Sequence, residues 1–155
     1  MMDWHFVHIP KTGGTSIRVA LNDPDGVHRR ASETLEPRFA FVRNPFERLI
    51  STYHFLKQAI DPSMKAQADC SLVDFVWLDK PIMQTQSYWL DAEVSFLGRF
   101  ENLAEDFRSI SDVKLPHIGG SVHLPWREYM NPELVKAIIE RYGGDFKRFG
   151  YVTKI

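Results

Sequence analysis

The clearest structural pattern in this 155-residue chain is Trp4-His5-Phe6-Val7-His8-Ile9-Pro10-Lys11-Thr12-Gly13-Gly14-Thr15-Ser16. Residues 4–9 form a short apolar and aromatic run that Pro10 ends, which is typical of a buried β-strand. Residues 11–16 make a turn rich in glycine and hydroxyl groups, and residues 17–21 then indicate a helix. A strand, a glycine-rich turn and a helix in this order are half of a βαβ unit.

The same order of elements occurs a second time. Residues 39–42 form a short apolar strand, and Arg43-Asn44-Pro45 follows it. Asn44 is a candidate helix cap and proline is favoured at the first helical position, so a helix is predicted from Pro45. Its apolar residues recur at helical spacing: Phe46, Leu49, Ile50, Tyr53 and Leu56. Two strand–turn–helix units predict an α/β fold with a parallel sheet flanked by helices.

The remaining chain predicts further elements of both kinds. They are helices over 71–79, over 101–110 and from 131 onward, and a strand over 94–100. Residues 61–70 and 113–130 indicate loops, and residues 84–90 are ambiguous. The length predicts one domain over residues 1–155.

Composition argues against several classes of protein. Lys and Arg number 19 against 20 Asp and Glu, which argues against a bulk electrostatic binder of nucleic acid. Cys70 is the only cysteine, so neither an internal disulfide nor a cysteine-based zinc site is expected. No apolar run approaches the roughly 18 residues that a membrane helix needs. The start of the chain lacks the pattern of a signal peptide, so a cytoplasmic protein without a membrane partner is expected.

The first turn has the composition of an anion-binding loop. Gly13 and Gly14 allow close approach of the backbone, and Lys11 brings a full positive charge. Thr12, Thr15 and Ser16 offer hydroxyl donors, and the N–H groups at the start of the helix add partial positive charge. The lysine precedes the glycines, so the Walker pattern is not met, which argues against a magnesium-dependent kinase or NTPase. An ordinary glycine turn with a surface lysine is the alternative.

Arg43 follows the second strand, and Ser51 lies eight residues later in the predicted helix. The carboxyl ends of parallel strands open on one edge of the sheet, so Arg43 and Lys11 are expected at the same edge. A guanidinium can hold a phosphate through two charge-assisted hydrogen bonds. A helix-capping arginine and an unengaged serine are the alternative.

These two segments resemble the nucleotide-binding motifs of a known family. Residues 6–16 are similar to the 5′-phosphosulfate loop of sulfotransferases, and residues 39–51 to their 3′-phosphate motif. Residues 98–103 and the stretch from 115 to 151 are similar to the carbohydrate branch, which includes Golgi heparan enzymes and small bacterial relatives. The resemblance covers nearly the whole chain.

The resemblance implies a P-loop-NTPase-like fold and 3′-phosphoadenosine 5′-phosphosulfate (PAPS) as sulfonate donor, with PAP as product and no metal. By motif position, Lys11 and the backbone of residues 12–16 hold the 5′-phosphosulfate, namely Thr12, Gly13, Gly14, Thr15 and Ser16. Arg43 and Ser51 hold the 3′-phosphate, and Ser121 approaches the nucleotide from the C-terminal loop. The acceptor implied is a carbohydrate or another small hydroxyl compound.

Two departures from the family pattern leave the acceptor open. The segment between Tyr53 and Val94 is short, and Gly119-Gly120-Ser121 stands where relatives often show Asn-x-Ser. The position sulfated and the oligomeric state are likewise not predicted.

Transfer to a hydroxyl also calls for a general base, and histidine is suited to that role near neutral pH. His28 lies in a segment similar to the one that carries the candidate base in related heparan enzymes, so we predict His28 as the base and Lys11 as the catalytic cation. Glu33 and the other histidines remain alternatives: His5, His8, His54, His117 and His123. A phosphotransferase on the same fold and an inactive nucleotide-binding module are the rival functions.

Overall fold

The computed structural model describes residues 3–155, which form two compact units. Among these residues, the first unit consists of 3–43 and 86–119, and the second of 44–85 and 120–155. The prediction of a single domain over residues 1–155 remains a prediction.

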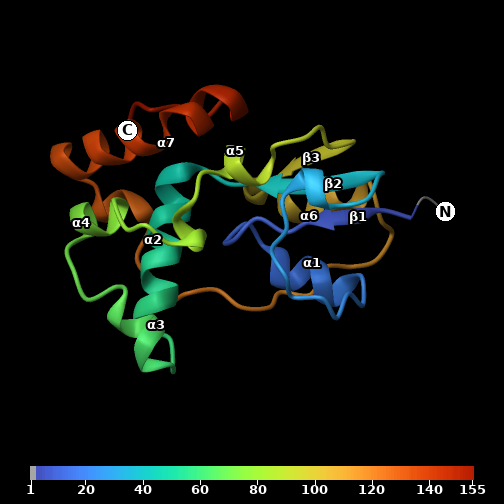
Figure 1. The fold of residues 1–155 in the computed structure, drawn as a ribbon, viewed down its shortest axis with the longest axis horizontal. Helices are drawn as coiled ribbons and strands as arrows, with labels where there is room; N and C mark the ends of the chain where they lie inside the picture. Colours follow the sequence, from blue (N-terminus) through green and yellow to red (C-terminus); the bar gives the residue numbers. More distant parts are fainter. Residues whose placement is uncertain (1–2) are drawn as a thin grey trace. The chain divides into compact units, whose positions relative to one another are not determined.

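The first unit is built on a parallel sheet (Figure 1). Its strands are β1 (His5–Val7), β2 (Arg38–Val42) and β3 (Phe96–Arg99), in the order β1-β2-β3. Phe6 pairs with Phe39, and Phe39 in turn with Phe96, so the three strands run in register and in one direction. All five residues of the central strand are buried. The predicted α/β fold with a parallel sheet is therefore confirmed.

The first unit also contains helices that connect or follow these strands. They are α1 (Gly14–Ala20), α5 (Gln86–Trp89) and α6 (Leu103–Arg108), with 3₁₀ turns η1 (Ala31–Glu33) and η3 (Phe100–Asn102). The core of this unit joins Ile17 of α1 and Phe107 of α6 to Phe39 and Phe41 of β2. α1 begins three residues before the predicted start, because its first turn is made of Gly14, Thr15 and Ser16 and shows no apolar periodicity.

The second unit is helical (Figure 1). Its α-helices are α2 (Pro45–Lys57), α3 (Pro62–Ala66), α4 (Leu72–Val76) and α7 (Pro132–Phe149), with 3₁₀ turns η2 (Pro81–Met83) and η4 (Trp126–Tyr129). The Asn44 side chain accepts a hydrogen bond from the Phe46 N–H, which confirms the predicted cap and the start of α2 at Pro45. α7 starts after Asn131 in the same way, and Gly150 follows its last residue with a left-handed φ of 67°.

The prediction of a loop over residues 61–70 was wrong, because α3 lies within it. No residue of α3 is buried, so this helix carries no apolar stripe. Its signal is local: the Asp61 side chain accepts a hydrogen bond from the Ser63 N–H at 2.8 Å, and Pro62 occupies the first turn. The turn η4 likewise falls inside the predicted loop 113–130. Among the helices described for residues 3–155, none is long and apolar enough to cross a membrane.

Candidate functional site

The ends of β1 and β2 bring Lys11 and Arg43 together. Arg43 follows β2 directly, and its Nη1 donates a hydrogen bond to the Lys11 carbonyl oxygen at 3.1 Å. The Arg43 guanidinium carbon lies 3.8 Å from the centre of the Phe100 ring, and Arg43 is only 7% exposed. The expectation that both residues lie at one edge of the sheet is confirmed.

Gln86 fixes the backbone of Arg43 from both sides. Its Oε1 accepts a hydrogen bond from the Arg43 N–H, and its Nε2 donates one to the Arg43 carbonyl, each at 2.8 Å. Gln86 is fully buried in α5. Nothing in the sequence pointed to this residue, because the partners are 43 positions apart and no local pattern links them.

Lys11 occupies an electrostatically and conformationally costly position. Its φ is 67°, in the left-handed region that residues other than glycine rarely adopt. Burial, followed by the nearby charge of Arg43, lowers the pKa of Lys11 from 10.5 to about 8. The two positive charges therefore lie close enough to repel each other, and an anion bound beside them would relieve that repulsion.

The hydroxyl groups of Thr12 and Ser16 make hydrogen bonds within the protein, whereas Thr15 is exposed to solvent. The fully buried Thr12 donates from Oγ1 to the Ile9 carbonyl at 2.9 Å. Ser16 Oγ donates to the Ile118 carbonyl at 3.3 Å and accepts from the Ile118 N–H at 3.2 Å. Thr15 is exposed. Two of the three hydroxyls that the sequence offers to an anion thus hold the loop and the segment near residue 118 in place.

Both glycines of the loop are needed for packing. Gly13 has a φ of 89°, and a Cβ there would lie 2.7 Å from the Leu103 side chain. A Cβ on Gly14 would lie 2.0 Å from His8 Nε2. From their sequence context these glycines were predicted to allow close approach of a ligand, and in the structure they also make room for α6 and for the His8 ring.

We expect Gly14→Ala to destabilise the protein by about 1–3 kcal/mol, because the new methyl group must displace a packed ring. Gly144→Ala in α7 is the matched control: a Cβ there meets nothing within 4 Å, so this change should leave stability equal or higher. The free energy of unfolding from denaturant titration measures both. Equal stability of the two variants would contradict the packing role of Gly14.

His28 contacts both the backbone and the ring of His8. His28 Nδ1 lies 2.6 Å from the His8 carbonyl oxygen, and the two rings are 4.1 Å apart between centres. A carbonyl can only accept a hydrogen bond, so Nδ1 carries the proton and Nε2 is the basic nitrogen of the neutral ring. Burial, His28 and Arg18 together lower the pKa of His8 to about 3, so His8 stays neutral at physiological pH.

Two further predicted residues meet in the second unit. Ser51 of α2 is 3% exposed, and Ser121 Oγ donates a hydrogen bond to its carbonyl oxygen at 3.1 Å. Near them, the His54 ring stacks on His123 at 5.3 Å and lies 5.1 Å from Tyr129. Burial and the neighbouring His123 and Lys57 lower the pKa of His54.

The carboxylate of Glu33, the alternative candidate base, interacts with the nearby Arg30. Its carboxylate accepts a hydrogen bond from the Arg30 N–H at 2.9 Å and forms an ion pair with the Arg30 guanidinium. The hydrogen bond from the Arg30 N–H is the main reason that the pKa of Glu33 is lowered. A carboxylate with a lowered pKa is a weak base.

Comparison with known proteins identifies the family of the chain. Searches of curated proteins and of solved structures gave no match. A sequence model described as "Sulfotransferase family" matches residues 4–152, a range that includes Lys11, His28, Arg43, Ser51 and Ser121. The match runs through both compact units and through both motifs that resemble the nucleotide-binding segments. The chain therefore belongs to the sulfotransferase family.

Proposed function

We propose that this protein transfers a sulfonate group from PAPS to a hydroxyl group of a carbohydrate or another small acceptor, in line and without a metal, and releases PAP. Membership of the family supports sulfonate transfer in general. The observation that carries the proposal is the pair formed by Lys11 and Arg43 at the carboxyl edge of the sheet.

The residues at this edge fit a donor that is anionic at both ends. Lys11 and Arg43 are cations, and burial, followed by the nearby charge of Arg43, lowers the pKa of Lys11. The Arg43 guanidinium packs on Phe100 and donates to the Lys11 carbonyl, while Gln86 holds the Arg43 backbone, so an anion would meet a side chain that is already ordered. Preorganised cations of this kind suit phosphate and sulfate groups.

The assignment of each residue to part of the donor follows the family motifs. Lys11 and the backbone N–H groups of residues 12–16 would hold the 5′-phosphosulfate. Arg43 and Ser51 would hold the 3′-phosphate, with Ser121 beside the nucleotide. Because the Thr12 and Ser16 hydroxyls are engaged within the protein, their proposed contribution is through the backbone.

PAPS, when bound, supplies the sulfonate: its bond from sulfur to the 5′-phosphate oxygen breaks, a bond from sulfur to the acceptor oxygen forms, and PAP leaves. The Lys11 ammonium binds the charge at the 5′ end and acts as a preorganised electrostatic group. His28 takes the proton of the acceptor hydroxyl at Nε2, since the His8 carbonyl holds the proton on Nδ1. His8 orients His28 and remains neutral itself.

A binding and turnover experiment tests the proposal. We expect PAP to raise the melting temperature in the presence of EDTA, and ATP with magnesium to have little effect. Radiolabelled PAPS should then transfer label to a member of a panel of glycans and small alcohols. Absence of PAP binding would overturn the proposal, and PAP binding without transfer to any acceptor would indicate a nucleotide-binding module.

We expect Arg43→Ala to weaken PAP binding about 10–100-fold, because a charge-assisted hydrogen bond contributes about 1.5–3 kcal/mol. Arg43→Lys keeps the charge but loses the forked geometry, so it should recover only part of the affinity. Arg38→Ala is the matched control, because Arg38 is 8% exposed at the opposite end of β2 and pairs with Glu36. Calorimetric titration with PAP measures all three, and equal affinities for the Arg43 and Arg38 variants would refute the assignment.

The affinity for PAP should depend on pH through Lys11. Lys11 has a pKa of about 8 in the free protein, and a bound anion raises that pKa. The full affinity is therefore present below pH 8 and falls above it as Lys11 loses its charge, by about tenfold at most, the same modest loss that is expected for Lys11→Ala. Titration from pH 7 to 10 measures it, a range above the phosphate pKa of about 6. A pH dependence that persists in Lys11→Ala would contradict the assignment.

A further inference from the structure

His28, the residue proposed as general base, lies in a stretch of the first unit that forms neither helix nor strand, residues 23–30. A general base must stay within hydrogen-bond reach of the proton that it takes. The backbone ladder of a helix or strand does not fix residue 28, so its position depends on side-chain contacts.

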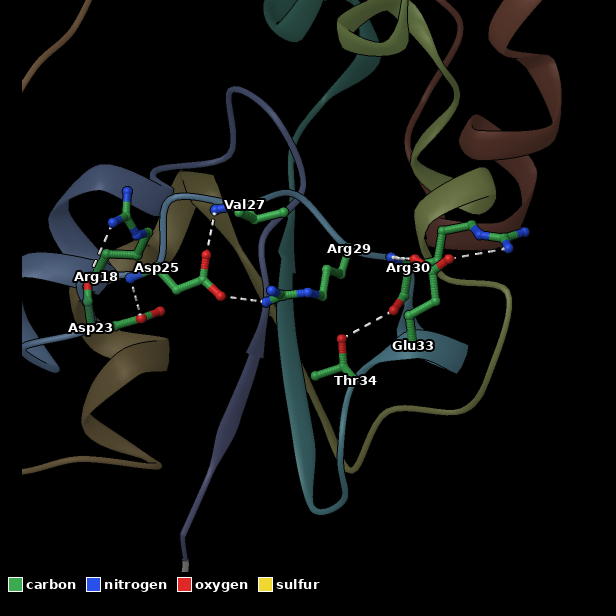
Figure 2. Close-up of polar contacts among 8 residues, drawn as sticks. All are labelled: Arg18, Asp23, Asp25, Val27, Arg29, Arg30, Glu33 and Thr34. Carbon is green, nitrogen blue, oxygen red and sulfur yellow. Dashed lines mark hydrogen bonds and ion pairs between the residues drawn. The ribbon is translucent and has the colours of Figure 1, made fainter.

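Contacts within this stretch shape it on both sides of the histidine, as Figure 2 shows. Before it, the Asp25 carboxylate accepts a hydrogen bond from the Val27 N–H at 3.1 Å and pairs with Arg29. After it, the Glu33 carboxylate accepts a hydrogen bond from the Arg30 N–H at 2.9 Å. Each contact joins residues two to four positions apart. They set the local shape of the stretch but do not attach it to the sheet.

Asp91 holds the same stretch from a distant part of the sequence. Its Oδ1 accepts a hydrogen bond from the Ser32 N–H at 2.9 Å, and its Oδ2 accepts one from Ser32 Oγ at 2.7 Å. Oδ2 also lies 3.4 Å from Arg30 Nη1. Asp91 and Ser32 are 59 positions apart. Both oxygens of one carboxylate therefore hold η1, which begins three residues after His28.

The chain just before Asp91 is itself fixed to the sheet. Gln86 of α5 makes its two hydrogen bonds to the backbone of Arg43, at the end of β2. Trp89 and Leu90, which follow in the chain, are 6% and 2% exposed. Asp91 therefore extends from an anchored and buried segment, and its carboxylate can serve as a fixed point for η1.

The same segment also contacts the histidine ring. The Trp89 ring lies 5.8 Å from the His28 ring between centres, and the His8 ring lies 4.1 Å from it. His28 Nδ1 is 2.6 Å from the His8 carbonyl oxygen. Residues 89–91 thus meet the ring of the proposed base through Trp89, and the backbone that follows this base through Asp91.

We propose that Asp91 is a positioning residue for His28. By holding Ser32 and Arg30, it keeps the His28 ring against the His8 carbonyl, and this contact keeps the proton on Nδ1 and makes Nε2 the basic nitrogen. The hydrogen bonds to Ser32 carry this role, because an ion pair between side chains that are 40% and 26% exposed contributes little. The inference rests on the proposed function, which assigns the base to His28.

The tautomer of His28 tests the inference without requiring turnover. Histidine ring ¹⁵N shifts, recorded at pH 8 where an ordinary histidine is neutral, show which nitrogen carries the proton. The parent should have it on His28 Nδ1, and Asp91→Ala should show exchange between both tautomers. The signal of His28 is assigned by its loss in His28→Asn. Parental His28 shifts in Asp91→Ala would overturn the inference.

Asp74→Ala is the matched control. Asp74 is an exposed acid of the second unit, and its carboxylate accepts a hydrogen bond from Ser71 Oγ at 2.7 Å, as that of Asp91 does from Ser32 Oγ. Its replacement removes a contact of the same kind and should leave the His28 shifts unchanged. The same change of shifts in both variants would overturn the specific role of Asp91.

Two further variants separate the hydrogen bonds from the charge. Asp91→Asn keeps an oxygen for the Ser32 N–H and an amide that can donate to Ser32 Oγ, so it should retain the parental tautomer although the charge is lost. Ser32→Ala removes only the hydroxyl contact and should shift the tautomer equilibrium part of the way. A parental tautomer in Ser32→Ala together with a lost one in Asp91→Asn would overturn the role assigned to the hydrogen bonds.

Kinetics show whether this position matters for transfer. We expect Asp91→Ala to lower kcat/KM about 10–100-fold, because a small misplacement of a catalytic group is costly, and to leave PAP affinity unchanged. In the His28→Asn background the same change should cost nothing further, since the base is already lost. An equal further loss there would overturn the inference. A changed tautomer with a parental rate would instead contradict the proposed role of His28 as base and leave its positioning by Asp91 standing.

Discussion

Lys11→Ala is expected to lower kcat for sulfonate transfer by a factor of about 100–1000 while weakening PAP binding much less. Removal of one preorganised group that stabilises charge in a transition state typically costs about 10²–10³ in kcat. PAP lacks the sulfonate and keeps the 3′-phosphate proposed to bind Arg43, so much of its affinity should persist. Single-turnover rates with PAPS and titration with PAP separate the two effects.

The melting temperature of Lys11→Ala shows whether a loss of rate comes from lost catalysis or from a damaged fold. The pKa of Lys11 in the folded protein lies below its ordinary value, so the folded state disfavours the charged form. At pH 7 the charged side chain therefore costs stability, and Lys11→Ala should melt at the same temperature as the parent or higher. Lys11→Gly also removes the left-handed strain at φ 67° and should show the same loss of rate.

An exposed lysine of the same unit provides the control for Lys11. Lys114→Ala should change neither rate nor affinity, because Lys114 lies on the surface. If Lys11→Ala turned over as fast as Lys114→Ala, Lys11 would have no part in the chemistry.

The fold was predictable where local signals set the elements. The proline after Ile9 and the cap formed by Asn44 with Pro45 act within a few residues, so they are visible in sequence. The repeated order of strand, turn and helix then implied parallel pairing, as found between β1 and β2. α3 was missed because none of its residues is buried, which leaves only its cap as a signal.

The candidate site was predictable only in part. Lys11 and Arg43 meet because neighbouring parallel strands end at one edge, which is a rule of topology. The clamp of Gln86 on Arg43 joins positions 43 apart, and the contact of Ser121 with Ser51 joins positions 70 apart. No local pattern encodes such contacts. The close packing of Gly14 against His8 is likewise a tertiary contact. It explains why glycine is needed at position 14, which the sequence context did not reveal.

His28→Asn is expected to lower kcat/KM by a factor of about 10²–10⁴, which is the usual contribution of a positioned general base. Asparagine can still donate a hydrogen bond from its Nδ2 to the His8 carbonyl, so the contact that positions residue 28 is kept while the basic nitrogen is lost. The pH profile is the decisive readout. The parent should lose rate as pH falls and the base becomes protonated, whereas the variant should lack that acidic limb.

The affinity of His28→Asn for PAP should remain unchanged, because the residue acts on the acceptor. His117→Asn is the matched control, since His117 is an exposed histidine of the same unit and should retain the parental rate and profile. A parental acidic limb in His28→Asn would assign the base to another group. The next variant would then be His54→Asn, because His54 lies beside His123 and Tyr129 and its lowered pKa keeps it neutral at physiological pH.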